Sequence, residues 1–105
     1  MNLDPVSPAV AVVTRLVAKP DRADEVSAFL VDAARLAGQE QGTIAWFALH
    51  TDMTTFWIVD AFRSEGERQS HLEGAIFSGL LDRGERLLEE LPEILPAEVL
   101  AAKLP

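Results

Sequence analysis

Cysteine is absent from this chain of 105 residues, histidine occurs only twice, and basic residues are scarce. Without cysteine the chain can form no disulfide, thiolate nucleophile, iron–sulfur cluster or thiolate zinc site. Nine Lys and Arg stand against 17 Asp and Glu, which gives a formal net charge of −8. Because no cluster of Lys or Arg interrupts this negative field, we expect neither nucleic acid nor an anionic membrane as a partner.

The two histidines, His50 and His71, are too few for a zinc site of three or four ligands unless carboxylates from unrelated segments join them. The glycine-rich, nucleophile-elbow and zincin motifs that mark nucleotide binding, ester hydrolysis and zinc proteolysis are also missing from the sequence. We therefore expect neither a metal ion nor an organic cofactor.

No stretch of the sequence has the length and hydrophobicity of a signal peptide or a membrane span. Together with the lack of cysteine, this favours a cytoplasmic protein. Hydrophobic residues make up 49% of the chain and charged residues 25%, proportions typical of a single globular domain over residues 1–105. Residues 1–8 are expected to form an extension in front of an ordered core at about 9–104.

The first half of the chain predicts a strand, a helix and a hairpin. Residues 9–18 are rich in valine, which favours a strand. Asp21 is expected to cap a helix that ends where Gly38 would adopt a left-handed conformation. The apolar stripe of this helix has the spacing of one buried face and consists of Val26, Phe29, Leu30, Ala33 and Ala37. Residues 43–50 and 55–62 predict two strands joined by a short polar turn.

The second half predicts two helices and a last strand. Ser64 and Glu67 form the S-x-x-E pattern of a capping box, so a helix should cover about 64–73. A further helix is expected over 75–92, ending at a proline, and a final strand over 99–104. The residues of that helix expected to point inward are Phe77, Leu80, Leu81, Leu87, Leu88 and Leu91. The order β, α, β, β, α, β predicts an α+β, ferredoxin-like fold with helices on one face of an antiparallel sheet.

Both faces of the predicted hairpin are apolar. Along the first strand of the hairpin Trp46 and Phe47 point to opposite faces, and along the second Ile58 and Val59 do. An antiparallel sheet covered on one side only should alternate apolar and polar residues. Leaving four large side chains wet would cost about 1.5–3 kcal/mol each, comparable to a whole domain's stability of about 5–15 kcal/mol. The pattern therefore predicts a homodimer in which two sheets pack together as an α+β barrel.

His71 is the first candidate for chemistry. It follows Glu67 at i, i+4 on the predicted helix, so this carboxylate can orient one ring nitrogen and leave the other free toward a pocket. That arrangement suits a general base near neutral pH. The alternative is a solvated helical pair. Asp60 and Arg63, which flank the turn into this helix, are expected to pair or cap there.

Aromatic residues crowd the predicted hairpin, namely Trp46, Phe47, Phe56, Trp57 and Phe62. They can line a slot for a flat aromatic ligand, although most such clusters are simply core. Alternation along the strands means that they cannot all face one cavity. His50, at the end of its predicted strand, is either a surface residue or a member of the site.

Four segments resemble the antibiotic biosynthesis monooxygenase family, especially its small quinol monooxygenase-like members. They are GTIAWFAL at 42–49, TTFWIVDAF at 54–62, RQSHL at 68–72 and LAAKLP at 100–105. The resemblance covers nearly the whole chain. It implies a ferredoxin-like protomer, sheet-to-sheet dimers, and oxidation of a phenol or hydroquinone by O2 without metal or flavin.

By position, the resemblance makes His71 the polar pocket residue, while the i, i+4 spacing makes Glu67 the residue expected to orient it. Substrate-binding residues are expected to be Trp46, Trp57, Phe62, Phe77 and His50. Phe62 and Ile76 stand where family members carry a Trp or Tyr and a second histidine, and the chain has no tyrosine. Two alternatives therefore stay open: a non-catalytic dimer that binds a small molecule, and an isomerase or cyclase that does not use O2.

Overall fold

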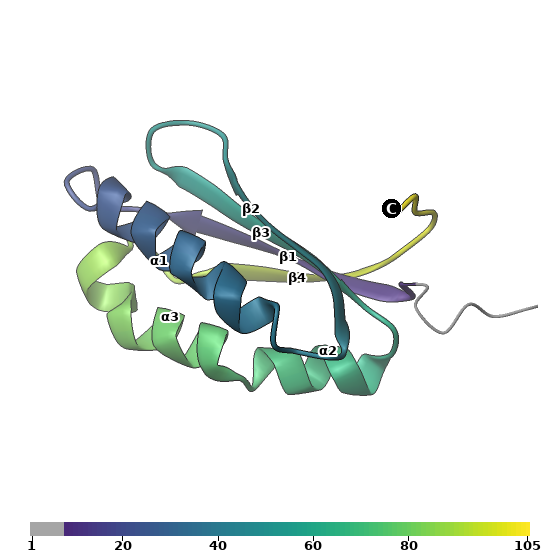
Figure 1. Cartoon of the computed structure of the whole chain (residues 1–105). Coiled ribbons are helices and arrows are strands. Elements are labelled where there is room, and N and C mark those ends of the chain that lie inside the picture. The colour runs from purple at the N-terminus through teal and green to yellow at the C-terminus, as the bar shows by residue number, and fades with distance from the viewer. Residues whose placement is uncertain (1–7) are drawn as a thin grey trace, which may run out of the picture.

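Four strands and three helices make up the fold in the computed structural model, which describes residues 8–105 (Figure 1). In chain order they are β1 (Val10–Val17), α1 (Ala23–Ala37), β2 (Thr43–His50), β3 (Thr55–Phe62), α2 (Glu65–Leu72), α3 (Ala75–Leu87) and β4 (Glu93–Glu98). Most of the expected extension at 1–8 lies outside the described residues. Both hairpin strands and the break before α3 are where the sequence predicts them.

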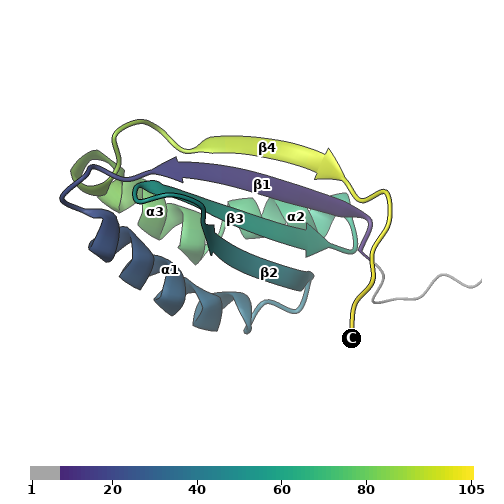
Figure 2. The same ribbon diagram turned by 90° about the horizontal axis from the view of Figure 1, so that it is seen from above.

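The strands form one antiparallel sheet in the order β2-β3-β1-β4. Val10 pairs with Phe62 and Thr14 with Ile58, so β1 and β3 are in register along their whole length. All three helices lie on one side of this sheet (Figures 1 and 2). The α+β, ferredoxin-like fold is therefore confirmed.

The core lies between the sheet and the helices because alternate strand residues point to the helical side. Leu16 on β1 and both Ile58 and Phe62 on β3 are fully buried there. The predicted stripe of α1 is buried at four positions, Val26, Leu30, Ala33 and Ala37, and Phe29 is half-buried. From α3 the core receives Ile76, Phe77, Leu80 and Leu87.

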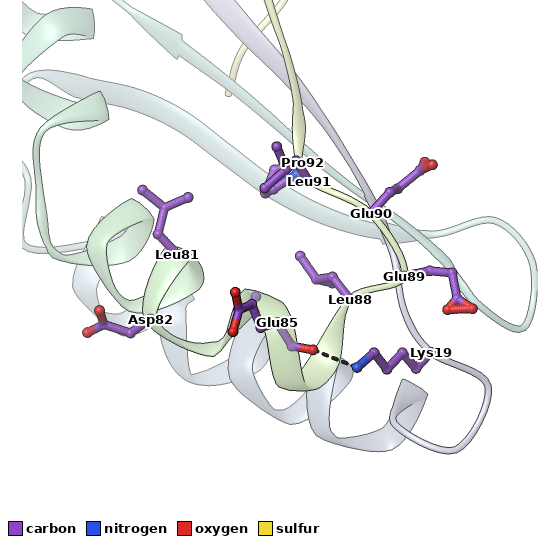
Figure 3. A pocket seen from close by; sticks show the side chains of 10 residues that line it. Lys19, Leu81, Asp82, Glu85, Leu88, Glu89, Glu90, Leu91 and Pro92 are labelled. Atoms are coloured by element: carbon purple, nitrogen blue, oxygen red, sulfur yellow. Dashed lines mark hydrogen bonds between the residues drawn. The ribbon is translucent and has the colours of Figure 1, made fainter.

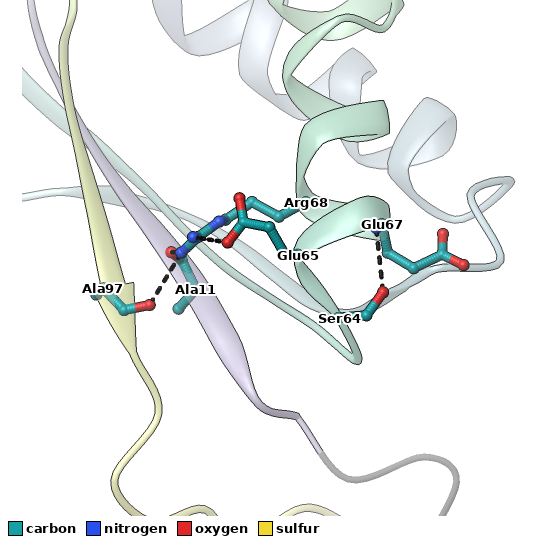
Figure 4. Close-up of polar contacts among 6 residues, drawn as sticks. All are labelled: Ala11, Ser64, Glu65, Glu67, Arg68 and Ala97. Carbon is teal, nitrogen blue, oxygen red and sulfur yellow. Dashed lines mark hydrogen bonds and ion pairs between the residues drawn. The ribbon is translucent and has the colours of Figure 1, made fainter.

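Arg68 fixes α2 on the sheet (Figure 4). Its Nη1 donates to the backbone oxygens of Ala11 on β1 and Ala97 on β4, each at 3.1 Å. Its Nη2 pairs with Glu65 one turn earlier on the same helix. Ser64 begins this helix as predicted, because its hydroxyl accepts the Glu67 backbone N–H at 3.2 Å. Ser64 thus fixes where the helix begins, and Arg68 holds the helix on the sheet.

The two predicted caps of α1 are wrong. Arg22, not Asp21, is the residue before the helix, and no side chain caps its first turn. Gly38 is right-handed, with φ −63°, and within residues 8–105 no glycine has a positive φ. The chain tightens after the helix instead, because the N–H groups of Gln39 and Glu40 bond to carbonyls three residues earlier.

The predicted C-terminal elements also need correction. The last helix ends at Leu87, before Pro92, because Leu88 turns extended and bridges to Ala18. Leu81 and Leu91 are 62% and 85% exposed rather than inward.

The last strand is β4 at Glu93–Glu98, not residues 99–104. Pro96 lies within β4, but β4 is an edge strand with only β1 beside it, and an edge tolerates proline.

The face of the sheet away from the helices is apolar and is covered by no segment within residues 8–105 (Figure 2). Register places Phe47, Leu49, Trp57, Val59 and Leu95 on this outer face. Phe47 is 56% exposed, and Leu49 and Leu95 are nearly half exposed. The two-sided apolarity seen in the sequence is thus a property of the folded chain.

None of the helices in the described residues is long and apolar enough to span a membrane.

Candidate functional site

His71 lies in the last turn of α2 with its side chain only 1% exposed. The imidazole points inward and touches two rings of the core. Its centroid is 5.0 Å from that of Phe62 at the end of β3 and 5.5 Å, edge-on, from that of Phe77 on α3. The sequence produces this burial because α2 starts directly after β3 and runs back over the helical side of the sheet.

Two carboxylates flank the ring of His71. Nδ1 is 2.6 Å from Glu40 Oε1, which comes from the loop between α1 and β2. Nε2 is 2.9 Å from Asp60 Oδ2 on β3, although the angle of this contact is not that of a hydrogen bond. Asp60 is fully buried, and Glu40 is 27% exposed. Glu40 Oε1 also accepts a hydrogen bond from Thr43 Oγ1 at 2.7 Å.

Burial lowers the pKa of His71, but the carboxylates of Asp60 and Glu40 outweigh it and raise that pKa above its ordinary 6.5. This favours the imidazolium near neutral pH, with both ring nitrogens occupied by a carboxylate. The sequence predicted a neutral imidazole with one free nitrogen, and this geometry does not provide one.

The predicted contact between Glu67 and His71 is absent. Glu67 is exposed, and its carboxylate lies over Gly42, where a β-carbon would overlap it. Glu67 contributes its backbone N–H to the Ser64 cap instead (Figure 4). The i, i+4 spacing brings the two residues to neighbouring turns, but the apolar core draws the imidazole inward while Glu67 stays in water.

Several polar atoms on the helical side of the sheet are buried without a hydrogen-bond partner. They include Thr14 Oγ1, Trp46 Nε1 and Asp60 Oδ1. Trp46 stands opposite Asp60 in the β2–β3 pairing, and Thr14 stands opposite Ile58 on β1, so all point to the helical side. An unsatisfied buried polar group costs about 1–3 kcal/mol. These donors and acceptors therefore have unmet hydrogen-bonding capacity within the core.

A pocket of about 290 Å³ adjoins the other side of His71. The residues that line it are Glu40, Gln41, Gly42, Thr43, Glu67, Ser70 and His71. Among residues 8–105, no three His, Asp or Glu side chains converge on a point that could hold a metal ion. Asp60 and Glu40 contact opposite nitrogens of one imidazole, so the arrangement is suited to hold and move a proton.

The predicted site residues divide into two groups. His71, Trp46, Phe62 and Phe77 all lie on the helical side of the sheet, close to one another or to the same core cluster. Trp57 lies on the outer face, where its Nε1 donates to Thr51 Oγ1 at 3.0 Å.

His50 is also separate from His71. It is exposed at the far end of β2 and stacks on Phe56, with ring centroids 4.2 Å apart.

The sequence interpretation missed the two carboxylates. Asp60 was expected to pair with Arg63, but Arg63 Nη2 donates to Gln41 O and Asp60 is buried against His71. The signal was present, because Asp60 shares the alternate positions of Phe56, Ile58 and Phe62 and is therefore a charge on a buried face. Glu40 is 31 residues from His71, and no local spacing points to it.

A larger hollow lies at the far end of α3, between this helix and the start of β4 (Figure 3). It has a volume of about 870 Å³, with Leu81, Leu88 and Leu91 among its lining residues and acidic residues around them. Lys19 Nζ donates to Glu85 O there at 2.6 Å and so caps the helix C-terminus. None of its described lining residues has a buried polar side-chain atom that lacks a partner.

No protein-family model matches this chain, and no curated protein matches it significantly. Solved structures do. NE2512, a protein of unknown function from Nitrosomonas europaea, is 44% identical with a TM-score of 0.91, covering 93% of this chain and 95% of that one.

Two more distant structures carry a functional name, "putative antibiotic biosynthesis monooxygenase". The one from Nitrosomonas europaea is 16% identical with a TM-score of 0.80, covering 88% of this chain and 99% of its own. The one from Bacteroides thetaiotaomicron is 17% identical with a TM-score of 0.76, covering 95% and 97%. Likeness at this identity concerns the fold. The chain therefore belongs to the same protein family as NE2512, and it has the fold of the antibiotic biosynthesis monooxygenase-like proteins.

Proposed function

We propose that this protein is a homodimeric, cofactor-independent monooxygenase that oxidises a small phenol or hydroquinone-like molecule with O2. The observation that carries the proposal is the buried contact of His71 Nε2 with Asp60 Oδ2 at 2.9 Å. The other oxygen, Asp60 Oδ1, lacks a hydrogen-bond partner, as do Thr14 Oγ1 and Trp46 Nε1 on the same side of the sheet. The fold shared with proteins named as monooxygenases supports the same reaction class.

In such a reaction the substrate supplies its own electrons. Loss of a proton from an anthrone-type CH2 group gives an electron-rich phenolate, which passes one electron to O2. The two radicals combine into a hydroperoxide, which then eliminates water. For an anthrone, one oxygen atom ends in the new carbonyl group and the other in water. A hydroquinone instead gives two electrons and two protons to O2, which yields a quinone and hydrogen peroxide, so neither reaction needs a metal or flavin.

The residues of the cluster have distinct tasks in this scheme. Asp60 Oδ1, a buried acceptor without a partner, takes the substrate proton. The imidazolium of His71 stabilises the resulting anion by its charge, in a site where low polarity strengthens electrostatics. Trp46 Nε1, on the strand beside Asp60, donates a hydrogen bond to the substrate oxygen. Phe62 packs against the His71 ring and excludes water.

The functional unit of this proposal is a dimer formed through the outer face of the sheet, in the cytoplasm. Phe47, Leu49 and Leu95 are each about half exposed on that face in a single chain. Burying such side chains against a second copy yields about 25 cal/mol per Å² of apolar surface removed from water. The outer face of a second copy is equally apolar, so packing the two sheets against each other removes both surfaces from water.

Oxygen uptake tests the activity. The protein is incubated with a panel of anthrones and hydroquinones while dissolved O2 and carbonyl product are recorded. We expect protein-dependent uptake of one O2 per product, reduced about 10²–10⁴-fold in Asp60→Asn and His71→Gln. His50→Gln is the matched control, because it removes the exposed histidine at the far end of β2. Equal rates in all four proteins would reject the proposed site.

Binding without oxidation is the second candidate function. Two features favour it. The chain has no tyrosine, and Ile76, at the position where family members carry a second histidine, is fully buried in an apolar cluster. In that case the same compounds raise the melting temperature but consume no O2. An isomerase or cyclase would instead form product under anaerobic conditions.

A further inference from the structure

Glu40, His71 and Asp60 form a continuous line of ionisable groups from the surface to the core. Glu40 Oε1 is 2.6 Å from His71 Nδ1, and His71 Nε2 is 2.9 Å from Asp60 Oδ2. The exposed fraction of the side chains falls along this line from 27% at Glu40 to 1% at His71 and zero at Asp60. Water therefore reaches only the first member.

Glu40 is held in place for this contact. Thr43 Oγ1 donates to the same oxygen of Glu40 at 2.7 Å, and the two residues also share a backbone bond from Thr43 N–H to Glu40 O at 3.3 Å. Both residues line the pocket of about 290 Å³ beside His71. Glu40 thus has one carboxylate oxygen fixed on the imidazole and access to solvent through that pocket.

We propose that Glu40 is the group through which the buried His71–Asp60 pair exchanges protons with solvent. In the outward step the Nδ1–H bond of His71 breaks and an O–H bond forms at Glu40 Oε1. Glu40 then releases this proton to water, and uptake follows the same path in reverse. One proton moves and no group is oxidised or reduced. Asp60, which solvent does not reach, communicates with water only across the imidazole.

The catalytic use of this path rests on the proposed function. When Asp60 accepts the proton of the substrate, release of the Nδ1 proton through Glu40 restores the net charge of the buried pair. The exchange itself needs no substrate. It is therefore measurable even in a protein that oxidises nothing.

Glu67 provides the matched control for Glu40. Both are glutamates that line the same pocket, but Glu67 makes no contact with the imidazole. The charged groups around His71 are Asp60 from β3, Glu40 from the loop before β2 and Glu67 on α2 itself, whereas α3 presents the apolar Phe77. Glu40→Gln and Glu67→Gln each remove one negative charge from the pocket, and only Glu40→Gln also removes a carboxylate in contact with the imidazole.

The test follows the His71 ring N–H signals by NMR in protein labelled with ¹⁵N-histidine. In Glu40→Gln we expect exchange of the Nδ1 proton with water to slow about 10²-fold, the lower end of what a positioned proton-transfer group contributes. Glu67→Gln should exchange at the wild-type rate. Unchanged exchange in Glu40→Gln, or equal slowing in both variants, would overturn the proposal.

Two further variants separate proton transfer from a structural role. Glu40→Ala opens space at the pocket, and added formate should restore exchange in proportion to its concentration, because a small carboxylic acid can take the place of the missing group. Thr43→Val keeps the carboxylate but removes its anchor and should slow exchange by less than Glu40→Gln. Absence of rescue by formate in a folded Glu40→Ala protein contradicts the relay. If the wild-type protein consumes no O2 but its His71 proton exchange depends on Glu40 as predicted, only the proposed function is rejected and the relay stands.

Discussion

At the scale of single residues, the site depends on where two carboxylates lie in three dimensions. His71 could be selected from the sequence, because it is one of two histidines and sits on a helix with a clear start at Ser64. Its partners could not be selected by helical spacing, since Glu40 and Asp60 come from a loop and a strand. Helical spacing pointed to Glu67 as the partner of His71, because spacing takes account only of neighbours on the same helix, whereas the buried His71 ring is surrounded by other elements.

The raised pKa of the buried His71 makes stability depend on pH. The pKa of His71 is raised in the folded protein by Asp60 and Glu40 against the effect of burial. Its contribution to stability is therefore fully present below the unfolded value of about 6.5 and is lost as pH rises through the folded pKa.

Urea unfolding at a series of pH values measures this dependence. The difference in unfolding free energy between wild type and His71→Gln should be largest below pH 6.5 and shrink above it. Asp60→Asn should move this decline to lower pH, because one of the two charges that favour the imidazolium is gone. A difference that grows with rising pH would have the wrong sign for this account.

At the scale of secondary structure, local signals predicted the elements that depend on local chemistry. The bounds of β2 and β3 follow from apolar strands around a polar turn, and the start of α2 follows from its cap. The misplaced elements depend on distant neighbours. Whether β4 pairs at all is decided by the free edge of β1, and α3 ends where Leu88 meets Ala18, which is 70 residues earlier.

Arg68 is the residue that joins these elements, and its loss should destabilise the fold. Arg68→Met keeps the aliphatic stem but removes both bonds to the carbonyls of Ala11 and Ala97. Hydrogen bonds to a charged group contribute about 1.5–3 kcal/mol, so we expect a loss of this size in unfolding free energy.

Arg35→Met serves as the control for Arg68→Met. It breaks an exposed pair with Asp32 on α1 and should change stability by less than about 0.5 kcal/mol. Similar losses in the two variants would show that the bridge from α2 to the sheet contributes little.

At the scale of the whole molecule, the sheet has helices on one side, and within residues 8–105 no segment covers the apolar surface on the other (Figure 2). The sequence was enough to predict this surface, because successive side chains of a strand point to opposite faces and both sets are apolar in the hairpin strands. The partner that covers it cannot be derived from one chain alone. The proposed homodimer is therefore a matter for measurement.

Light scattering should give twice the chain mass of 11.5 kDa for the wild-type protein at micromolar concentration. Phe47→Glu places a charge on the outer face and should yield monomers, because burying an unpaired charge is strongly unfavourable. Val31→Glu is the control, since Val31 is 74% exposed on α1, on the helical side of the sheet. A wild-type monomer, or dimers that persist in Phe47→Glu, would rule out this interface.

The central claim is that a charged imidazole is held in the core between Asp60 and Glu40. Titration of His71 by ¹⁵N NMR tests it most directly. The account predicts two protonated ring nitrogens and a midpoint above pH 6.5, lowered in both Asp60→Asn and Glu40→Gln. A neutral imidazole at pH 6.5, with one bare nitrogen and no response to either substitution, would contradict it.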